Sequence, residues 1–206
     1  MTVTPILSIK NPLAISECKK SISAGGVIIF PTDTVYGIGC SAYQPIPIKR
    51  IFEIKGRDFS KPLPILIGDL EQINLVASGL DQRSEKLIKT FWPGPLTIIL
   101  PMHTSLPPNL SPYETVGIRM PNHPWLLDLI RKSGPLAATS ANTSGSPEAR
   151  NVEEVIKTLG GRIDLIIDGG QSCSHLPSTV VNCQSTEIKV LREGPISEAA
   201  IFASLN

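Results

Sequence analysis

The sequence predicts a single α/β domain built on a twisted sheet of parallel and antiparallel strands. Short apolar runs typical of buried strands alternate irregularly with stretches whose apolar residues recur at helical spacing. Such interleaving favours an α/β domain over an all-α or all-β domain. The 206 residues contain no internal repeat and no linker-like change in composition. We therefore expect residues 1–206 to form one domain.

Six stretches are predicted as helices, because their apolar residues recur at helical spacing and several begin with a capping residue or a proline. They cover residues 12–24, 45–55, 70–78, 81–91, 124–132 and a last stretch from 152. Asn11 is expected to cap the first helix, with Pro12 at its first position, and Gly25–Gly26 to end it. Asp69 is expected to cap the third, and Trp92–Pro95 must break the fourth.

Eight short apolar runs are predicted as strands, since each is bounded by turn-forming or polar residues. They cover residues 27–30, 64–67, 96–100, 115–120, 136–138, 165–167, 179–182 and 188–191. Residues 102–114 are expected to form a loop, and its length and prolines make it a candidate lid.

Composition excludes several classes of protein. With 41% hydrophobic residues, 18% charged residues and a mean hydropathy of +0.12, the chain is too apolar to be disordered. No apolar run approaches the ~18 residues of a membrane span, and the first residues lack a secretory signal, so we expect a cytoplasmic protein. The net charge of +1 argues against a protein that coats nucleic acid, although a local basic groove is compatible with it.

The cysteines and histidines lack the spacing of a zinc site or a redox pair, so we expect buried thiols and no metal site. These residues are Cys18, Cys40, Cys173, Cys183, His103, His123 and His175. The 19 prolines are about 9% of the chain against a typical ~5%, which predicts many turns.

Polar clusters follow several predicted strands, where loops on a rigid sheet commonly carry function. In residues 31–37 (PTDTVYG), hydroxyls flank a carboxylate; they either grip a small polar ligand or bond their own backbone. In residues 55–63 (KGRDFSKPL), three cations lie within seven residues, which fits either a bound phosphate or a solvated loop. Neither a Walker pattern nor a dinucleotide-binding glycine pattern is present.

Further polar positions follow later strands. Residues 138–145 (ATSANTSG) combine small side chains with hydroxyls, which suits phosphate or carboxylate oxygens. Arg192 ends a strand beside a glycine turn, where a lone arginine is usually a surface residue. Arg119 lies on a strand among apolar neighbours and needs an anionic partner, either a structural carboxylate or a ligand. No catalytic triad, nucleophile elbow or cysteine signature is present, which favours chemistry by positioning and charge stabilisation.

In this order, the motifs resemble those of the YrdC-like threonylcarbamoyl-AMP synthase family. The resemblance runs from about residue 25 to 197 and is carried by PTDTVYGIG, KGRDFSKPL, FWPGPLTIIL, TVGIRMP, TSANTSG, STVV and LREG. It implies a YrdC-like domain with helices packed around a basic cavity. It also implies an L-threonylcarbamoyladenylate synthase, a nucleotidyltransferase that joins L-threonine, bicarbonate and ATP into threonylcarbamoyl-AMP and releases pyrophosphate. A downstream tRNA threonylcarbamoyl transferase complex would use this product to make threonylcarbamoyladenosine at position 37.

The resemblance implies roles for the residues that match it. L-Threonine would be bound by Thr32, Arg119, Thr139 and Thr179. ATP would be bound by Lys55, Arg57, Thr115, Ser140, Asn142, Arg150 and Arg192, of which Lys55 and Arg57 would be catalytic. Mg²⁺ would arrive with ATP rather than occupy a protein site. The sequence departs from the family pattern at Asp58, where proline is usual, and at Asn182, where aspartate is expected.

Two alternatives remain open. In the first, the protein is an RNA-binding module whose basic stripe holds duplex RNA by its phosphates. The stripe would comprise Lys49, Arg50, Lys55, Arg57 and Lys61. The near-neutral charge and few aromatic residues count against it, and weak RNA binding would also be compatible with the enzyme. In the second, the chain is a carbamoyl-handling domain of a larger maturation protein, but the 206 residues hold no companion domain or zinc-finger cysteines.

Overall fold

The computed structural model describes residues 4–172, 174, 176–185 and 187–205. In this part of the chain, ten strands form one sheet in the order β1-β8-β2-β3-β7-β4-β6-β5-β9-β10. Four of its neighbouring pairs are parallel and five antiparallel, which confirms the predicted mixed sheet. The strands are β1 (Ile6–Ser8), β2 (Ile28–Phe30), β3 (Gly37–Ser41), β4 (Ile65–Leu66), β5 (Leu96–Pro101), β6 (Thr115–Arg119), β7 (Leu136–Ser140), β8 (Leu165–Asp168), β9 (Thr179–Asn182) and β10 (Lys189–Arg192).

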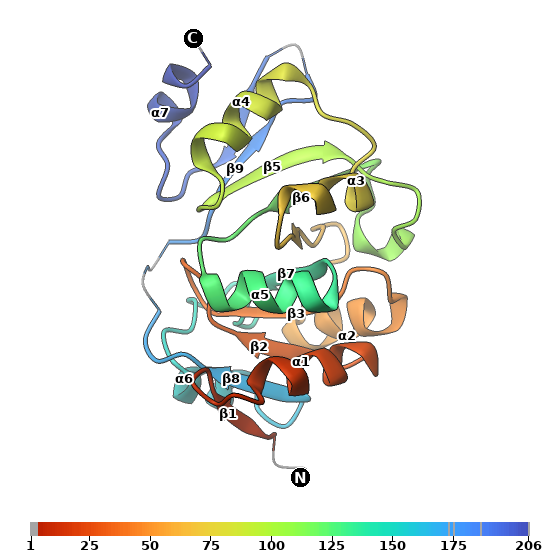
Figure 1. Cartoon of the computed structure of the whole chain (residues 1–206), viewed down its shortest axis with the longest axis vertical. Coiled ribbons are helices and arrows are strands. Elements are labelled where there is room, and N and C mark those ends of the chain that lie inside the picture. Colours follow the sequence, from red (N-terminus) through yellow and green to blue (C-terminus); the bar gives the residue numbers. More distant parts are fainter. Residues whose placement is uncertain (1–3, 173, 175, 186, 206) are drawn as a thin grey trace.

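Helices cover both faces of the sheet. They are α1 (Ala14–Ser23), α2 (Pro45–Lys55), α3 (Ile73–Val76), α4 (Gln82–Phe91), α5 (Pro124–Ser133), α6 (Val152–Leu159) and α7 (Glu198–Ala203), with 3₁₀ helices η1 (Leu70–Gln72) and η2 (Pro108–Leu110). Figure 1 shows α1 and α5 on the near face, α2 and α6 behind the sheet, and the two chain ends at opposite ends of the molecule. Among the described residues, no helix is long and apolar enough to cross a membrane.

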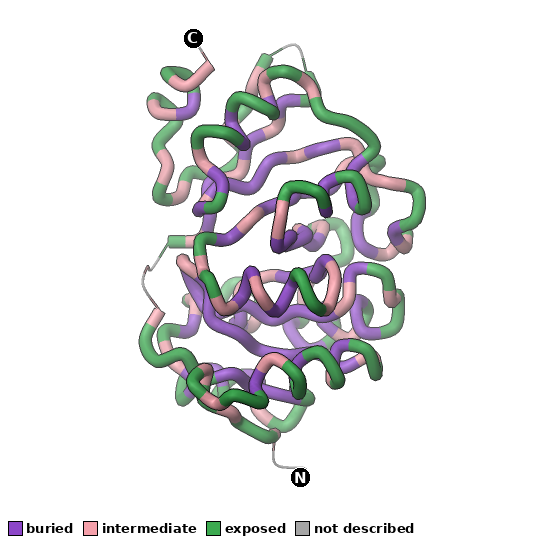
Figure 2. Tube along the Cα trace, in the orientation of Figure 1, coloured by how far each residue is buried: buried purple, intermediate pink, exposed green. Residues whose placement is uncertain are grey.

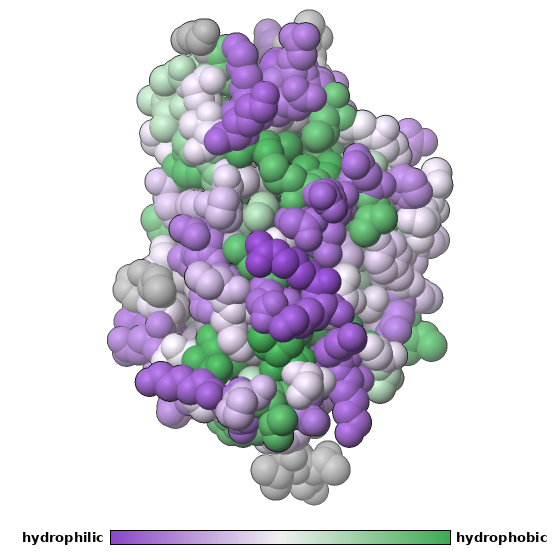
Figure 3. Space-filling view, viewed as in Figure 1, coloured by the Kyte–Doolittle hydropathy of each residue, from purple (hydrophilic) through white to green (hydrophobic). Residues whose placement is uncertain are grey.

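The core has two parts because successive residues of a strand point to opposite faces of the sheet. In β2, Ile28 and Phe30 pack with apolar residues of α1 and α5, whereas Ile29 packs into the larger cluster on the other face. The central strands are buried along their length, and the edge strands β1 and β10 are largely exposed (Figure 2). On the face seen in Figure 3, hydrophilic side chains gather over α5, where Arg131 and Lys132 are exposed.

All eight predicted strands and all six predicted helical stretches are present; α2 and β9 have the predicted bounds, and the other elements have at least one shifted end. The cap predicted at Asp69 is confirmed, because Asp69 accepts the Gln72 N–H at 3.1 Å. Asp81, which was expected inside the fourth helix, instead caps α4 by accepting the Ser84 N–H at 2.8 Å. The start predicted for the first helix was wrong. Asn11 accepts the Leu13 N–H at 2.9 Å, which forms a turn before the helix, and α1 begins only at Ala14.

The sequence did not predict β1, β3 or α7. In β3, Gly37 and Gly39 lower strand propensity, but both are packed against the Phe30 ring of β2. The loop at residues 102–114 is present and includes η2. Its Leu106 and Leu110 are buried in the core, and none of its residues lines the cavity described below; its role as a lid stays a prediction.

Candidate functional site

A cavity of about 150 Å³, partly open to solvent, lies against the middle of the sheet. The loop after β2, strands β4 to β7, the segment before β9 and the end of β10 all contribute to its wall. The lining residues are Thr32, Thr34, Val35, Tyr36, Gly37, Arg57, Pro64, Leu66, Thr97, Arg119, Ala138, Thr139, Ser140, Pro177, Ser178 and Arg192. Six of the residues assigned by resemblance therefore meet in one cavity: Thr32, Arg57, Arg119, Thr139, Ser140 and Arg192.

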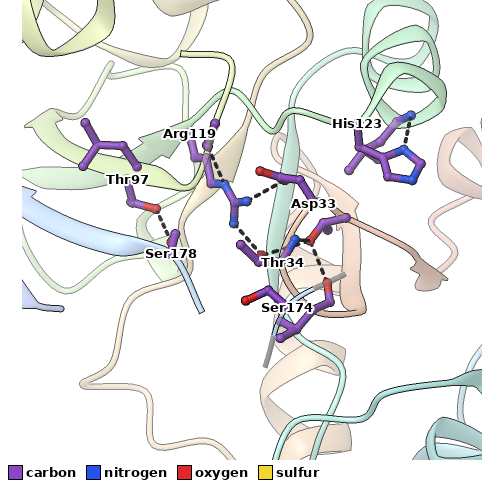
Figure 4. Close-up of polar contacts among 12 residues, drawn as sticks. Asp33, Thr34, Thr97, Arg119, His123, Ser174 and Ser178 are labelled. Atoms are coloured by element: carbon purple, nitrogen blue, oxygen red, sulfur yellow. Dashed lines mark hydrogen bonds and ion pairs between the residues drawn. The ribbon is translucent and has the colours of Figure 1, made fainter. Parts of the chain in front are cut away.

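Arg119 is held from three directions at the cavity wall (Figure 4). Its Nε donates to the Gly94 carbonyl at 3.1 Å, Nη1 to Thr34 Oγ1 at 3.1 Å, and Nη2 to Asp33 Oδ1 at 2.6 Å. Burial lowers the pKa of Arg119, and the Asp33 carboxylate raises it. The anionic partner that the sequence required is thus a structural carboxylate. A guanidinium has five N–H donors, so these three bonds to described residues leave two for a ligand.

Lys55 lies behind the cavity rather than in its wall. Its side chain is buried, and Nζ donates to the Ser140 carbonyl at 2.5 Å, to the Asn142 carbonyl, and to Asn142 Oδ1 at 3.3 Å. The pKa of Lys55 is lowered to about 8, chiefly by burial and also by the charge of Arg57, while the charge of Glu148 acts in the opposite direction. The ammonium group therefore ties the end of α2 to the turn that follows β7.

The turn after β7 is closed by its own side chains. Ser140 Oγ donates to Asn142 Oδ1 at 2.6 Å, and Asn142 Nδ2 donates to the Ser146 carbonyl at 2.5 Å. The Ser144 N–H donates to the Lys55 carbonyl at 2.8 Å, so α2 and the turn hold each other in both directions. This bonding keeps Ser140 at the cavity wall while Asn142 stays buried behind it.

Arg57 and Arg192 bring two further cations to the cavity. Arg57 donates to the Lys61 and Pro62 carbonyls at 3.0 Å, which folds the loop after α2 around it. Asp58 accepts the Ser60 N–H at 2.8 Å, so the aspartate found where proline is usual closes a turn in the same loop. Burial lowers the pKa of Arg57, and the charge of Arg192 lowers it further. Three guanidinium groups around one cavity favour an anionic ligand.

The other assigned residues have mixed positions. Thr32 lines the cavity, but its hydroxyl donates to the Val35 carbonyl at 2.7 Å. Thr179 is fully buried outside the lining, where its Oγ1 donates to the Ile196 carbonyl and accepts the Gly194 N–H. Thr115 starts β6 outside the lining, and Arg150 lines a separate, smaller cavity beside Glu148. Asn182 accepts the Gln184 N–H at 2.9 Å.

Four lining residues with a side-chain hydroxyl had no assigned role: Thr34, Tyr36, Thr97 and Ser178. All four lie in motifs that carried the resemblance, but a motif does not say which of its side chains point into a cavity. Tyr36, for example, uses its hydroxyl to accept the Gly169 N–H and to donate to the Gly170 carbonyl. Only Thr97 could have been singled out from the sequence as a cavity residue, because it is a polar residue between the apolar positions 96 and 98 of a buried strand.

The basic stripe required by the RNA-binding alternative does not form as one exposed surface. Lys49 pairs with Glu53 at 3.6 Å, and Arg50 pairs with Asp164 at 2.9 Å. Lys55 is buried, and Arg57 faces the cavity. In the described residues, no cluster of three or more His, Cys, Asp or Glu side chains could hold a metal ion. Cys18, Cys40 and Cys183 are buried free thiols, whereas Cys173 and His175 lie outside the described residues.

Comparison with known proteins gives consistent matches. The family model Sua5_yciO_yrdC, described as "Telomere recombination", matches residues 20–194. Threonylcarbamoyl-AMP synthase of Bacillus subtilis is 42% identical over 207 residues, covering 98% of this chain and 59% of that protein. The crystal structure of Pyrococcus abyssi Sua5 complexed with L-threonine matches with a TM-score of 0.93 and 36% identity, over 99% of this chain and 61% of that one. Escherichia coli YciO matches with a TM-score of 0.85 and 28% identity, over 95% and 97%. The chain thus spans about three fifths of the length of the first two relatives.

Proposed function

Since the chain belongs to the Sua5–YciO–YrdC family, we propose that it is an L-threonylcarbamoyladenylate synthase. The reaction converts L-threonine, bicarbonate and ATP into threonylcarbamoyl-AMP, pyrophosphate and water. One observation carries the proposal: Arg119, with two N–H donors left by its structural partners, lines the same cavity as Arg57, Arg192 and the Ser140 hydroxyl. A carboxylate and a triphosphate could therefore bind side by side.

The chemistry requires positioning more than a protein nucleophile. The threonine amine attacks the carbon of bicarbonate and water leaves, which gives a carbamate. A carbamate oxygen then attacks the α-phosphorus of ATP, and pyrophosphate leaves. Arg119 would hold the threonine carboxylate, while Arg57 and Arg192 would offset the negative charge of the phosphates. Holding the reactants together can lower the barrier by about 7–11 kcal/mol, because the reaction no longer depends on a bimolecular encounter.

We also propose the other roles and partners as parts of this function. Mg²⁺ would enter with ATP and bridge its phosphates. Thr32 and Thr139 would contact L-threonine from the cavity wall, and Lys55 would hold the Ser140–Asn142 turn in place for the nucleotide. The product would pass to a tRNA threonylcarbamoyl transferase complex, in the cytoplasm where ATP and tRNA are present. Thr179, Thr115 and Arg150 remain predicted contacts.

The test is pyrophosphate release by the purified protein with ATP, Mg²⁺ and bicarbonate, with L-threonine present, omitted or replaced by L-serine. We expect release that depends on L-threonine, together with a threonylcarbamoyl adenylate identified by mass spectrometry. Arg119→Ala should lose threonine affinity and keep ATP affinity, whereas Arg131→Ala, on the exposed face of α5, should behave like the wild type. ATP binding without threonine-dependent release would contradict the proposal, and RNA titration would then test the alternative.

A further inference from the structure

Two hydroxyl groups form a buried pair in the cavity and have no role in the scheme above. Thr97 Oγ1 of β5 lies 2.8 Å from Ser178 Oγ, which immediately precedes β9. Thr97 is 4% exposed and Ser178 is 5% exposed, yet both line the cavity. The parallel pairing of β5 with β9 brings them together, since Leu96 lies opposite Thr179. Figure 4 shows the pair beside Arg119, on the side away from Asp33.

The pair has one hydroxyl proton more than its described neighbours use. Two hydroxyls carry two protons, and the bond between them consumes one, whichever group donates. Arg192 Nη2 lies 3.2 Å from Ser178 Oγ, but a guanidinium only donates and so takes up no proton. Within the described residues, no further acceptor contacts either hydroxyl. A buried donor without a partner is rare, so the pair is suited to a ligand that accepts a hydrogen bond.

The threonine side chain of this pair has a defined place in the sheet. Gly117 lies on the neighbouring strand β6, and a Cβ atom added there would lie 2.9 Å from Thr97 Cγ2. The glycine therefore leaves the space that the Thr97 methyl group fills. Because χ1 of threonine is restricted, seating the methyl group also fixes the direction of the hydroxyl.

Of the three arginines that line the cavity, Arg192 is the one whose charge acts on, or is acted on by, both of the others. Burial lowers the pKa of Arg57, and the nearby charge of Arg192 lowers it further. Burial also lowers the pKa of Arg192, the charge of Glu148 raises it, and the charge of Arg119 lowers it. Arg192 also donates from Nε and Nη2 to the Ser178 carbonyl, at 3.0 and 2.8 Å. Arg192 and the hydroxyl pair are thus the part of the cavity that neighbours both Arg57 and Arg119.

We infer that the Thr97–Ser178 pair is the subsite for a small planar oxyanion: bicarbonate, and then the carbamate formed from it. The inference rests on the proposed function. In that reaction the amino-acid carboxylate needs Arg119 and the triphosphate needs Arg57, while the carbamate is the group that joins the two. Its place is therefore between them, where the unused hydroxyl proton can bind one of its oxygens.

The test measures the bicarbonate KM in carbon-dioxide-depleted buffer for the wild type, the double variant Thr97→Val/Ser178→Ala, and Thr97→Ser. The double variant removes both hydroxyl groups, so no hydroxyl proton is left for the ligand, and we expect the bicarbonate KM to rise about tenfold. The threonine KM and the Kd for ATP should stay within about twofold. Thr97→Ser keeps both hydroxyls and should keep the bicarbonate KM within about threefold of the wild type. Thr158→Val, on the exposed face of α6, is the matched control and should change none of these values.

Each other outcome overturns the inference in a distinguishable way. An unchanged bicarbonate KM in the folded double variant Thr97→Val/Ser178→Ala excludes the subsite and leaves the proposed function intact. A rise in the threonine KM instead would assign the pair to the amino acid. If Thr97→Val/Ser178→Ala does not fold, Thr97→Ala/Ser178→Ala is measured by the same criteria. If the wild-type protein releases no pyrophosphate, the proposed function fails and this inference fails with it.

Discussion

Arg119 shows how a single buried cation can serve both the fold and a ligand. Its side chain is 8% exposed, and that of its partner Asp33 is 13% exposed, so little water reaches the ion pair. Breaking such a pair from one side leaves an uncompensated buried charge, which is strongly destabilising. Thr34 and the Gly94 carbonyl fix the orientation of the guanidinium as well. Asp33 is therefore a positioning residue that acts through Arg119.

Replacing Asp33 tests this positioning role. In Asp33→Asn the Arg119 guanidinium keeps an amide acceptor but loses its countercharge, so we expect a loss of about 1–3 kcal/mol in the free energy of unfolding. The threonine KM should rise about tenfold while the Kd for ATP stays within about twofold, because the guanidinium is less well oriented. Urea denaturation and steady-state kinetics measure the two effects. A stability loss with an unchanged threonine KM would reduce Asp33 to a structural partner.

If the chain has the proposed function, Lys55 should make ATP binding dependent on pH. Its pKa is lowered to about 8, so the ammonium is charged below that pH and loses its proton as the pH rises through it. Deprotonation removes one positive charge and one of the donors to Ser140 and Asn142. We expect the Kd for ATP, measured calorimetrically, to rise about tenfold between pH 7 and pH 9, which corresponds to about 1.4 kcal/mol. Lys55→Met should bind ATP weakly at both pH values. The same pH dependence in that variant would assign the effect to another group.

At the scale of elements, the sequence predicted the helices and strands well where their periodicity is strong. Helices α4 and α5 begin within one residue of their predicted starts, because apolar spacing and a capping residue or proline are local signals. Strand β3 was missed because its two glycines signal a turn locally. The two positions hold glycine because the Phe30 ring of the neighbouring strand leaves no room for a side chain there. Strand β1 was missed because three partly exposed residues carry little periodicity, and β8 supplies its pairing.

The packing of β2 against β3 predicts a specific defect. A Cβ atom at Gly37 would lie 2.7 Å from Phe30 Cε2, and the Phe30 ring is fully buried, so it has little room to move. We expect Gly37→Ala to lower the free energy of unfolding by about 1–3 kcal/mol. Gly79→Ala is the control: its Cβ meets nothing within 4 Å, and we expect a change within about 0.5 kcal/mol. Equal stabilities of the two variants in urea would show that Phe30 adjusts freely.

At the scale of the whole molecule, the cavity is assembled from segments far apart in the chain. Residues 32–37, 138–140, 177–178 and 192 reach it only because β3, β7 and β9 take their places in the sheet. The sequence could place the motifs near one another by resemblance. It could not show that Lys55 lies behind the wall while Arg57 lies in it, because that depends on how α2 ends against the turn after β7.

This assembly predicts which regions respond when ligands bind. With MgATP and L-threonine each at about 100 times its Kd, each ligand stabilises the native state by about 2.7 kcal/mol, which slows amide exchange through openings that release one of them by about a hundredfold. We expect slower exchange in residues 31–37, 138–146 and 177–179. Strands β1 and β8 lie at one edge of the sheet and supply none of the cavity lining, so their exchange through local opening should not change. Hydrogen exchange by mass spectrometry resolves these peptides. Protection centred on β1 and β8 would place the ligands elsewhere, and protection by ATP alone in Arg119→Ala would separate the nucleotide end of the cavity from the threonine end.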